Sequence, residues 1–215
     1  MKKKQIAQLG VTLSLVAAVG VGGTLAALTA KSEVVTNTFT VGAGLHDSDI
    51  LLDEAPVDPN TGKEISGSRV QSNEYKNLEQ GDQLDKDPSV SITSTAADCY
   101  VFVLVQGVKN SPYYDVTIDS NWVEVTDSSF NTDDTQLYVY STDESNAAVV
   151  TGGLSVENGV VFDGVKIKDD APLYTDVDED GNFDKANLDQ IVVKACAVQA
   201  SNNPYENALK QITFG

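Results

Sequence analysis

The sequence predicts an all-β fold: a jelly-roll-like β-sandwich with short helices in its loops, preceded by a helical signal peptide. Three observations support this class. Short runs of β-branched and aromatic residues recur along the chain, Asn, Asp, Gly and Pro separate them, and helical periodicity is scarce. Many short strands joined by such turns are typical of antiparallel sandwiches.

The first 26 residues have the layout of a secretory signal peptide. Lys2, Lys3 and Lys4 form a positive segment, and residues 9–28 are almost entirely apolar or small. Small residues at the −3 and −1 positions predict cleavage between Ala26 and Ala27. An uncleaved anchor is the alternative, because the uncharged stretch is long enough for a hydrocarbon core of about 30 Å. The glycines at positions 20, 22 and 23 favour cleavage, since they break the helix just before this site.

The strands and helices expected from local pattern follow in chain order. One β-hairpin is expected at Asn158-Gly159, because this dipeptide stands between two apolar runs. Short helices are expected over residues 185–191 and 205–211. Residues 191–199 alternate less cleanly than the others and are expected to be buried on both faces. The strands are expected at residues 90–94, 100–105, 113–118, 122–125, 137–140, 160–167 and 191–199.

Length and charge predict one acidic domain. Removal of residues 1–26 from the 215-residue chain leaves 189 residues, which we divide into a segment 27–41 and a single β-sandwich domain 42–215. Residues 53–88 lack a regular pattern and are expected to form a surface excursion. The formal charge of −18 becomes −21 when the three signal lysines leave. Such a chain repels nucleic acid, so no nucleic-acid partner is expected.

Cys99 and Cys196 are the two cysteines of the chain, and both lie in strand-like runs. In an exported protein they are a candidate disulfide, provided that the two strands are neighbours and the side chains share a face. Two free, buried thiols are the alternative.

No enzyme active site is recognisable in the sequence. The single histidine, His46, cannot supply a zinc-protease helix, and no serine stands in a nucleophile elbow. A Gly-rich phosphate loop before a helix is also absent from the sequence. Tyr113, Tyr114, Tyr138 and Tyr140 are expected to pack a sheet; a sugar site is the alternative. The chain is therefore expected not to be an enzyme and to require no cofactor.

One motif has the spacing of a calcium loop. Carboxylates stand at its positions 1, 3 and 5, a glycine at 6, and further oxygen donors at 7 and 9, as in the first part of an EF-hand loop. Asn187 replaces the bidentate glutamate at position 12, so calcium would bind weakly. An acidic surface turn is the alternative. The candidate calcium ligands are Asp176, Asp178, Asp180, Asn182 and Asp184.

Several blocks resemble the TasA/camelysin family, whose members Gram-positive bacteria export through the dedicated signal peptidase SipW. The blocks occur in the family's order and span nearly the whole chain. Cys196 stands where the family usually has an aromatic residue, and residues 53–75 match no part of the pattern. The blocks are Gly22-Gly-Thr-Leu-Ala-Ala-Leu-Thr-Ala, Val35-Thr-Asn-Thr-Phe-Thr-Val-Gly42, Gly81-Asp-Gln-Leu-Asp-Lys-Asp-Pro88, Ala97-Asp-Cys-Tyr-Val-Phe-Val103, Val161-Phe-Asp-Gly-Val-Lys166 and Ile191-Val-Val-Lys-Ala-Cys-Ala-Val-Gln-Ala200.

The resemblance implies a secreted subunit of a biofilm-matrix fibre, in the extracellular matrix or at the cell surface. Its implied partners are further copies of itself or related fibre subunits, and signal peptidase during export. In such fibres the N-terminal segment of one subunit completes a sheet of the next. Here residues 27–41 contain no Pro or Gly, and Val35, Phe39 and Val41 share one strand face, with Asn37 the polar exception. Pairing of this segment within its own chain is the alternative.

Two other functions are carried as alternatives. One is a calcium-dependent surface adhesin or binding module. The other is a camelysin-like metallo-endopeptidase, for which this sequence provides no metal-binding helix.

Overall fold

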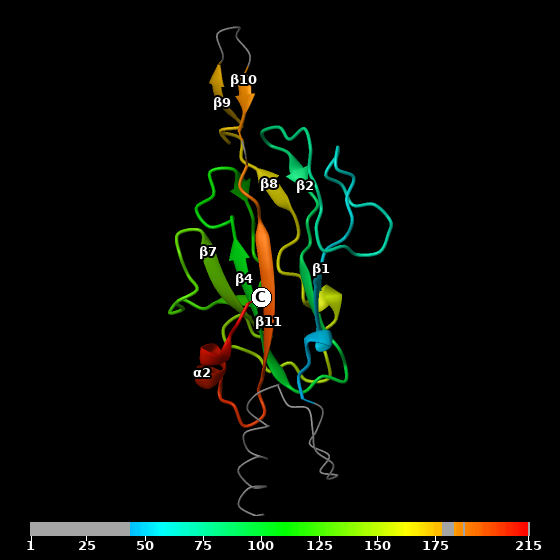
Figure 1. Ribbon diagram of the computed structural model, residues 1–215, viewed down its shortest axis with the longest axis vertical. Coiled ribbons are helices and arrows are strands. Elements are labelled where there is room, and N and C mark those ends of the chain that lie inside the picture. Colours follow the sequence, from blue (N-terminus) through cyan, green and yellow to red (C-terminus); the bar gives the residue numbers. More distant parts are fainter. Residues whose placement is uncertain (1–43, 178–182, 187, 215) are drawn as a thin grey trace, which may run out of the picture. The chain divides into compact units, whose positions relative to one another are not determined.

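The computed structural model describes residues 44–177, 183–186 and 188–214. This part is built mainly from antiparallel strands with one short α-helix (Figure 1), which confirms the all-β class. Residues Leu45–Gly215 form one compact unit. The elements are η1 (Asp47–Asp49), β1 (Ile50–Asp53), β2 (Gln83–Leu84), β3 (Ser89–Ile92), β4 (Cys99–Gln106), β5 (Tyr114–Asp115), β6 (Trp122–Glu124), β7 (Thr135–Tyr140), η2 (Val156–Asn158), β8 (Val165–Ile167), β9 (Tyr174–Val177), β10 (Phe183–Lys185), β11 (Val192–Gln199), α2 (Tyr205–Ala208) and η3 (Leu209–Gln211).

The largest sheet has four antiparallel strands in the order β11-β4-β7-β6. Its central strand β4 reads Cys-Tyr-Val-Phe-Val-Leu-Val-Gln, an apolar run typical of a strand covered on both faces. Val101, Phe102 and Val103 are fully buried, although consecutive side chains of a strand point to opposite faces. Other parts of the chain must therefore cover both faces of the sheet.

The inner face of this sheet, defined by Val101, Val103 and Val105, packs against a second β layer. That layer contains the pair β1-β3 and the three-stranded sheet β2-β8-β5. Val90 of β3 and Ile167 of β8 are fully buried in the same core as the inner face. The main core thus lies between two β layers, a sandwich-like arrangement.

The outer face, defined by Phe102, Leu137 and Val139, is covered by the C-terminal segment. Ala208 and Ile212 are buried against it, and the Tyr205 ring stacks on Phe102 with centroids 6.2 Å apart. Helices α2 and η3 together span Tyr205–Gln211, which confirms the helix expected there. This segment forms a second, smaller core.

Most expected strands are present, with two shortened. The expected strands at 90–94, 100–105, 122–125, 137–140 and 191–199 correspond to β3, β4, β6, β7 and β11. Within 113–118 only β5 forms, and within 160–167 only β8 forms. An isolated bridge between Ile118 and Phe162 joins the remaining parts. Strands β1 and β2 and the pair β9–β10 were not expected.

The prediction of a hairpin at Asn158-Gly159 is wrong. Residues Val156–Asn158 form the 3₁₀ helix η2, and the flanking residues both bridge to β3: Leu154 to Ile92 and Val160 to Ser89. Gly159 is required by a close approach, because a Cβ there would lie 1.8 Å from the carbonyl oxygen of Val90. Its φ is negative, so it does not adopt the left-handed conformation of a type I′ turn.

The helix expected over residues 185–191 is also wrong. Strand β10 ends at Lys185, and the described residues between it and β11 contain no helix. Tyr114 donates a hydrogen bond of 2.7 Å from its hydroxyl to the carbonyl oxygen of Asp189. The backbone of this connection is therefore held by a side chain from β5, not by helical hydrogen bonds.

Residues 53–88 form the irregular excursion that the sequence predicts, and the single arginine of the chain organises it. The Arg69 guanidinium donates to the carboxylate and carbonyl oxygens of both Asp53 and Asp87. Five rigid donors suit such a multiple contact better than an ammonium does. Arg69 thereby joins the end of β1 to the segment that enters β3.

Candidate functional site

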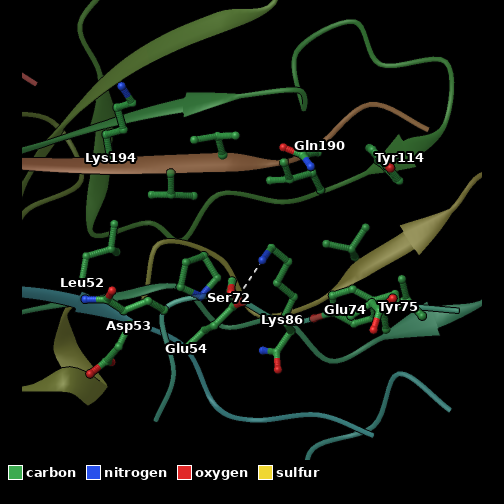
Figure 2. A pocket seen from close by; sticks show the side chains of 18 of the residues that line it. Leu52, Asp53, Glu54, Ser72, Glu74, Tyr75, Lys86, Tyr114, Gln190 and Lys194 are labelled. Carbon is green, nitrogen blue, oxygen red and sulfur yellow. Dashed lines mark hydrogen bonds and ion pairs between the residues drawn. The ribbon is translucent and has the colours of Figure 1, made fainter. Parts of the chain in front are cut away.

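The described part contains a groove between β1 and β11, with a volume of about 850 Å³. Figure 2 shows β11 along one side; β1 and the excursion residues Ser72, Glu74 and Tyr75 lie along the other. Leu84 and Val165 of the second layer and Tyr114 of β5 complete the lining. The groove therefore lies where the edges of the two β layers meet.

Along this groove the main core is incompletely covered. Ile50 and Leu52 of β1, with Val193 and Ala195 of β11, pack against the core but are only half-buried. On the neighbouring strand β4 the inner-face residues are almost completely buried. A row of half-buried apolar side chains in a groove is a surface suited to an apolar partner.

The edge of β11 that faces the groove is unpaired. Ala200 N–H donates to Asp98 C=O, and Gln199 lies opposite Cys99 in the ladder with β4. Because hydrogen-bonded and non-hydrogen-bonded pairs alternate, the backbone groups of Val193 and Ala195 point away from β4. Within residues 44–177, 183–186 and 188–214, no other strand pairs with this edge.

The facing edge of β1 has the same property. Thr93 N–H donates to Asp49 C=O, and Ile50 lies opposite Ile92 in the ladder with β3. The alternation therefore directs the backbone groups of Ile50 and Leu52 away from β3. The described residues offer them no hydrogen-bond partner. Two strand edges with open N–H and C=O groups thus border one apolar groove, a combination that recruits a further strand.

The distance between β1 and β11 determines whether a further strand fits between them. Some Cα atoms of β1 and β11 lie within 8 Å of each other. Direct pairing places strands about 4.8 Å apart, and an inserted strand requires about 9.6 Å between its two neighbours. Among the described residues no ladder joins β1 and β11, and at their closest part they are too near for a third strand. Insertion therefore requires the two strands to move apart there.

Charged groups line the part of the groove formed by the excursion. Lys86 Nζ lies 2.6 Å from Glu54 Oε2, and the side chains are 14% and 5% exposed, the most buried ion pair among the described residues. Tyr75 donates a hydrogen bond to the carbonyl oxygen of Asp85. Burial raises the pKa of Tyr75, and the negative charges of Glu54, Asp85 and Asp87 raise it further. The hydroxyl consequently remains a protonated donor at neutral pH.

The two cysteines lie on adjacent strands but on opposite faces of the sheet. Cys99 is opposite Gln199 on the inner face, and Cys196 is opposite Phe102 on the outer face. Both thiols are free, so the candidate disulfide is not formed. Burial raises the pKa of Cys99 to about 11, helped by Asp98 and Asp49, and burial also raises the pKa of Cys196. Their strands are neighbours, but a shared face is missing.

Several residues predicted as sites lie outside the described part. They are the cleavage positions Ala26 and Ala27 and the strand residues Val35, Phe39 and Val41. The candidate calcium ligands Asp178, Asp180 and Asn182 also lie outside it; the backbone of Asp176 and Asp184 lies on the paired strands β9 and β10. No group of three or more acidic, histidine or cysteine residues suited to a metal occurs elsewhere in the described residues.

Three further residues that the sequence singled out are His46, Tyr114 and Tyr140. His46 is exposed directly before η1, and its backbone N–H donates to the Asp49 carboxylate. Tyr140 packs edge-on against Trp122, and Tyr114 lines the groove. None of the helices in the described residues has the length and apolar character of a membrane span.

Sequence reasoning missed the groove itself and the residues that form it. β1 reads Ile-Leu-Leu-Asp, too short a run to distinguish from a loop. The excursion carries Pro, Gly and Asn signals typical of a surface loop, and nothing local shows that it borders β11. The imperfect alternation of residues 191–199 was interpreted as burial on both faces, and this is wrong: β11 is an edge strand of its sheet, and most of its residues are only half-buried.

Comparison with protein-family models, with curated proteins and with solved structures finds no match to this chain.

Proposed function

We propose that this chain is an exported structural subunit of an extracellular fibre, in which residues 27–41 of one subunit add as a strand to the β1–β11 groove of the next. The observation that carries the proposal is the pair of unpaired strand edges bordering a half-buried apolar groove. An added strand supplies both missing elements, backbone hydrogen bonds and apolar side chains.

The donor segment has the chemistry that the groove requires. Val35, Phe39 and Val41 would point into the groove, and the opposite face presents Thr36, Thr38 and Thr40, which suit exposed strand positions. Fifteen extended residues reach at most about 50 Å, enough to cross to a neighbouring subunit. With this strand added, the two layers would join at one edge, and the sandwich would become jelly-roll-like.

Export would control when the donor becomes available. Signal cleavage after Ala26 would free the segment that begins at Ala27. Before cleavage, the apolar signal would hold the segment at the membrane. The resemblance to the TasA/camelysin family supports the same arrangement, in which the product would act in the extracellular matrix or on the cell surface. Fibre formation requires no cofactor in this proposal.

Strand addition needs a small rearrangement that the fold permits. β1 pairs only with β3 and has four residues, so it can separate from β11 without breaking its own ladder. The Arg69 contacts hold the far end of β1 to Asp87 at the entry to β3. We therefore expect β1, β3 and the excursion to move together when the groove opens.

The test is assembly of the mature chain beginning at Ala27. Concentration of this protein is expected to produce fibres visible by electron microscopy, whereas deletion of residues 27–41 leaves monomers. Phe39→Asp is expected to abolish assembly, and the matched control Thr38→Asp, on the opposite strand face, to retain it.

Two results contradict the proposal. One is a wild-type chain that stays monodisperse at millimolar concentration, with its tail paired to its own body. The other is fibre formation that persists without residues 27–41.

A further inference from the structure

We infer that Asn37 of the incoming strand lies against the Lys86–Glu54 ion pair and sets the register of strand addition, an inference that rests on the proposed function. Asn37 is the one polar residue on the otherwise apolar donor face Val35, Phe39 and Val41. The ion pair is the most buried one among the described residues, and both of its members line the groove (Figure 2).

The ion pair retains hydrogen-bonding capacity, whereas two nearby polar groups of the groove, Asn73 and Asp53, are already engaged. An ammonium has three N–H donors, and Lys86 Nζ has Glu54 as its described hydrogen-bond partner. By contrast, Asn73 accepts from Val57 N–H and donates to Ala55 C=O. Asp53 is engaged by Arg69. An entering polar side chain therefore finds hydrogen-bond partners at Lys86 and Glu54.

A strand that covers this pair removes its remaining water. An apolar side chain at that point would leave donors of Lys86 and lone pairs of Glu54 without partners, which is unfavourable in a groove shielded from solvent. The Asn37 amide supplies a complementary pair of groups: its Nδ2 donates to the carboxylate, and its Oδ1 accepts from the ammonium. A single polar residue on an apolar face is also an established means of fixing register.

Among alignments that keep residues 35–41 in the groove, only one satisfies this requirement. A shift by one residue turns the whole donor over, so that threonines face the core. A shift by two residues moves the strand about 6.7 Å and brings Val35 or Phe39 to the ion pair. With Asn37 at the pair, Val35 and Phe39 lie about 6.7 Å to either side. Apolar groups such as Leu52, Val193, Leu84 and Val165 line the same groove.

The experiment measures the critical concentration for fibre formation of the mature chain and three variants. Valine has a higher strand propensity than asparagine and is more apolar, so a groove without a polar requirement would make Asn37→Val assemble better than wild type. Our inference predicts the opposite sign: a rise in critical concentration of about fivefold to tenfold. Asn37→Ser, which keeps a donor and an acceptor, is expected to stay within about threefold of wild type. The control Thr36→Val, on the other face, is expected to leave it within about twofold.

A second arm removes the ion pair. In the double variant Glu54→Leu, Lys86→Leu, the effect of Asn37→Val is expected to reverse, so that valine assembles better than asparagine. If that variant fails to fold, the Asn37→Val and Asn37→Ser comparison decides alone. Equal or improved assembly of Asn37→Val overturns the register contact while leaving strand addition intact. Loss of the proposed function is seen separately, as fibres that are absent from wild type or independent of residues 27–41.

Discussion

Proline substitutions in β11 test separately the edge that faces the groove and the edge that pairs with β4. The N–H of Ala195 points into the groove and makes no hydrogen bond to β4, whereas the N–H of Cys196 lies in a hydrogen-bonded pair with Phe102. Ala195→Pro therefore removes a donor that the isolated subunit does not use. Cys196→Pro, one residue further, removes a donor of the sheet ladder.

The expected magnitudes differ for folding and for assembly. Ala195→Pro is expected to change the free energy of unfolding by about 1 kcal/mol or less, because proline is tolerated where an edge N–H faces outward. Cys196→Pro loses a ladder hydrogen bond and leaves the buried Phe102 carbonyl without a partner, which costs about 3 kcal/mol. For assembly, Ala195→Pro loses one hydrogen bond to the donor, and its ring obstructs the approach, so the critical concentration should rise at least about tenfold.

Urea unfolding followed by circular dichroism measures the first quantity, and sedimentation with electron microscopy measures the second. Fibres formed by Ala195→Pro at the wild-type concentration would show that no strand pairs with the groove edge of β11. An Ala195→Pro protein as unstable as Cys196→Pro would show that the assignment of outward and inward N–H groups is wrong.

Four further outcomes are expected. Phe102→Ala, at a fully buried site beneath Tyr205, should lower the free energy of unfolding by about 3–5 kcal/mol, measured in urea. Hydrogen bonds from the Glu64 N–H and then from Lys63 lower the pKa of Asp85. The contribution of Asp85 to stability is therefore present above about pH 4 and is lost as the pH falls through the lowered pKa. Asp85→Asn should flatten that acid loss of stability, measured by thermal unfolding between about pH 4 and pH 2. At pH 8 Cys99 and Cys196 should resist alkylation in the folded protein and both react after unfolding without reductant, as mass spectrometry would report. Calorimetry in millimolar calcium should record weak binding to residues 176–184.

Each of these outcomes has a contrary result. A Phe102→Ala protein within 1 kcal/mol of wild type, a figure set by the usual range for surface substitutions, would mean that the outer face is not a packed core. An unchanged acid profile in Asp85→Asn would remove that carboxylate from the acid response. Thiols that need reductant before alkylation would establish a disulfide, and calcium that produces no heat would leave the Asp-rich motif as a surface turn.

Local pattern predicted the strands that are long and apolar. β4 and β11 were recognisable because most of the eight residues in each carry β-branched, aromatic or small apolar side chains. The helix over Tyr205–Gln211 was recognisable because its residues follow a helical period. Where the local signal was a turn dipeptide, at Asn158-Gly159, the prediction failed. Both flanking segments pair with β3 and not with each other, and Gly159 serves the close approach to Val90.

The sequence by itself determined the all-β class and the acidic character of this protein, and it indicated which residues of the long strands face opposite ways. These properties follow from composition and from a two-residue period, which are local. Only the tertiary structure decided that Cys99 and Cys196 lie on opposite faces and that Arg69 joins β1 to the entry of β3. It also decided that β1 and β11 border a groove whose strand edges are unpaired among the described residues. Register and strand order depend on contacts between residues far apart in the chain, and no local pattern encodes which strand edge is left without a partner.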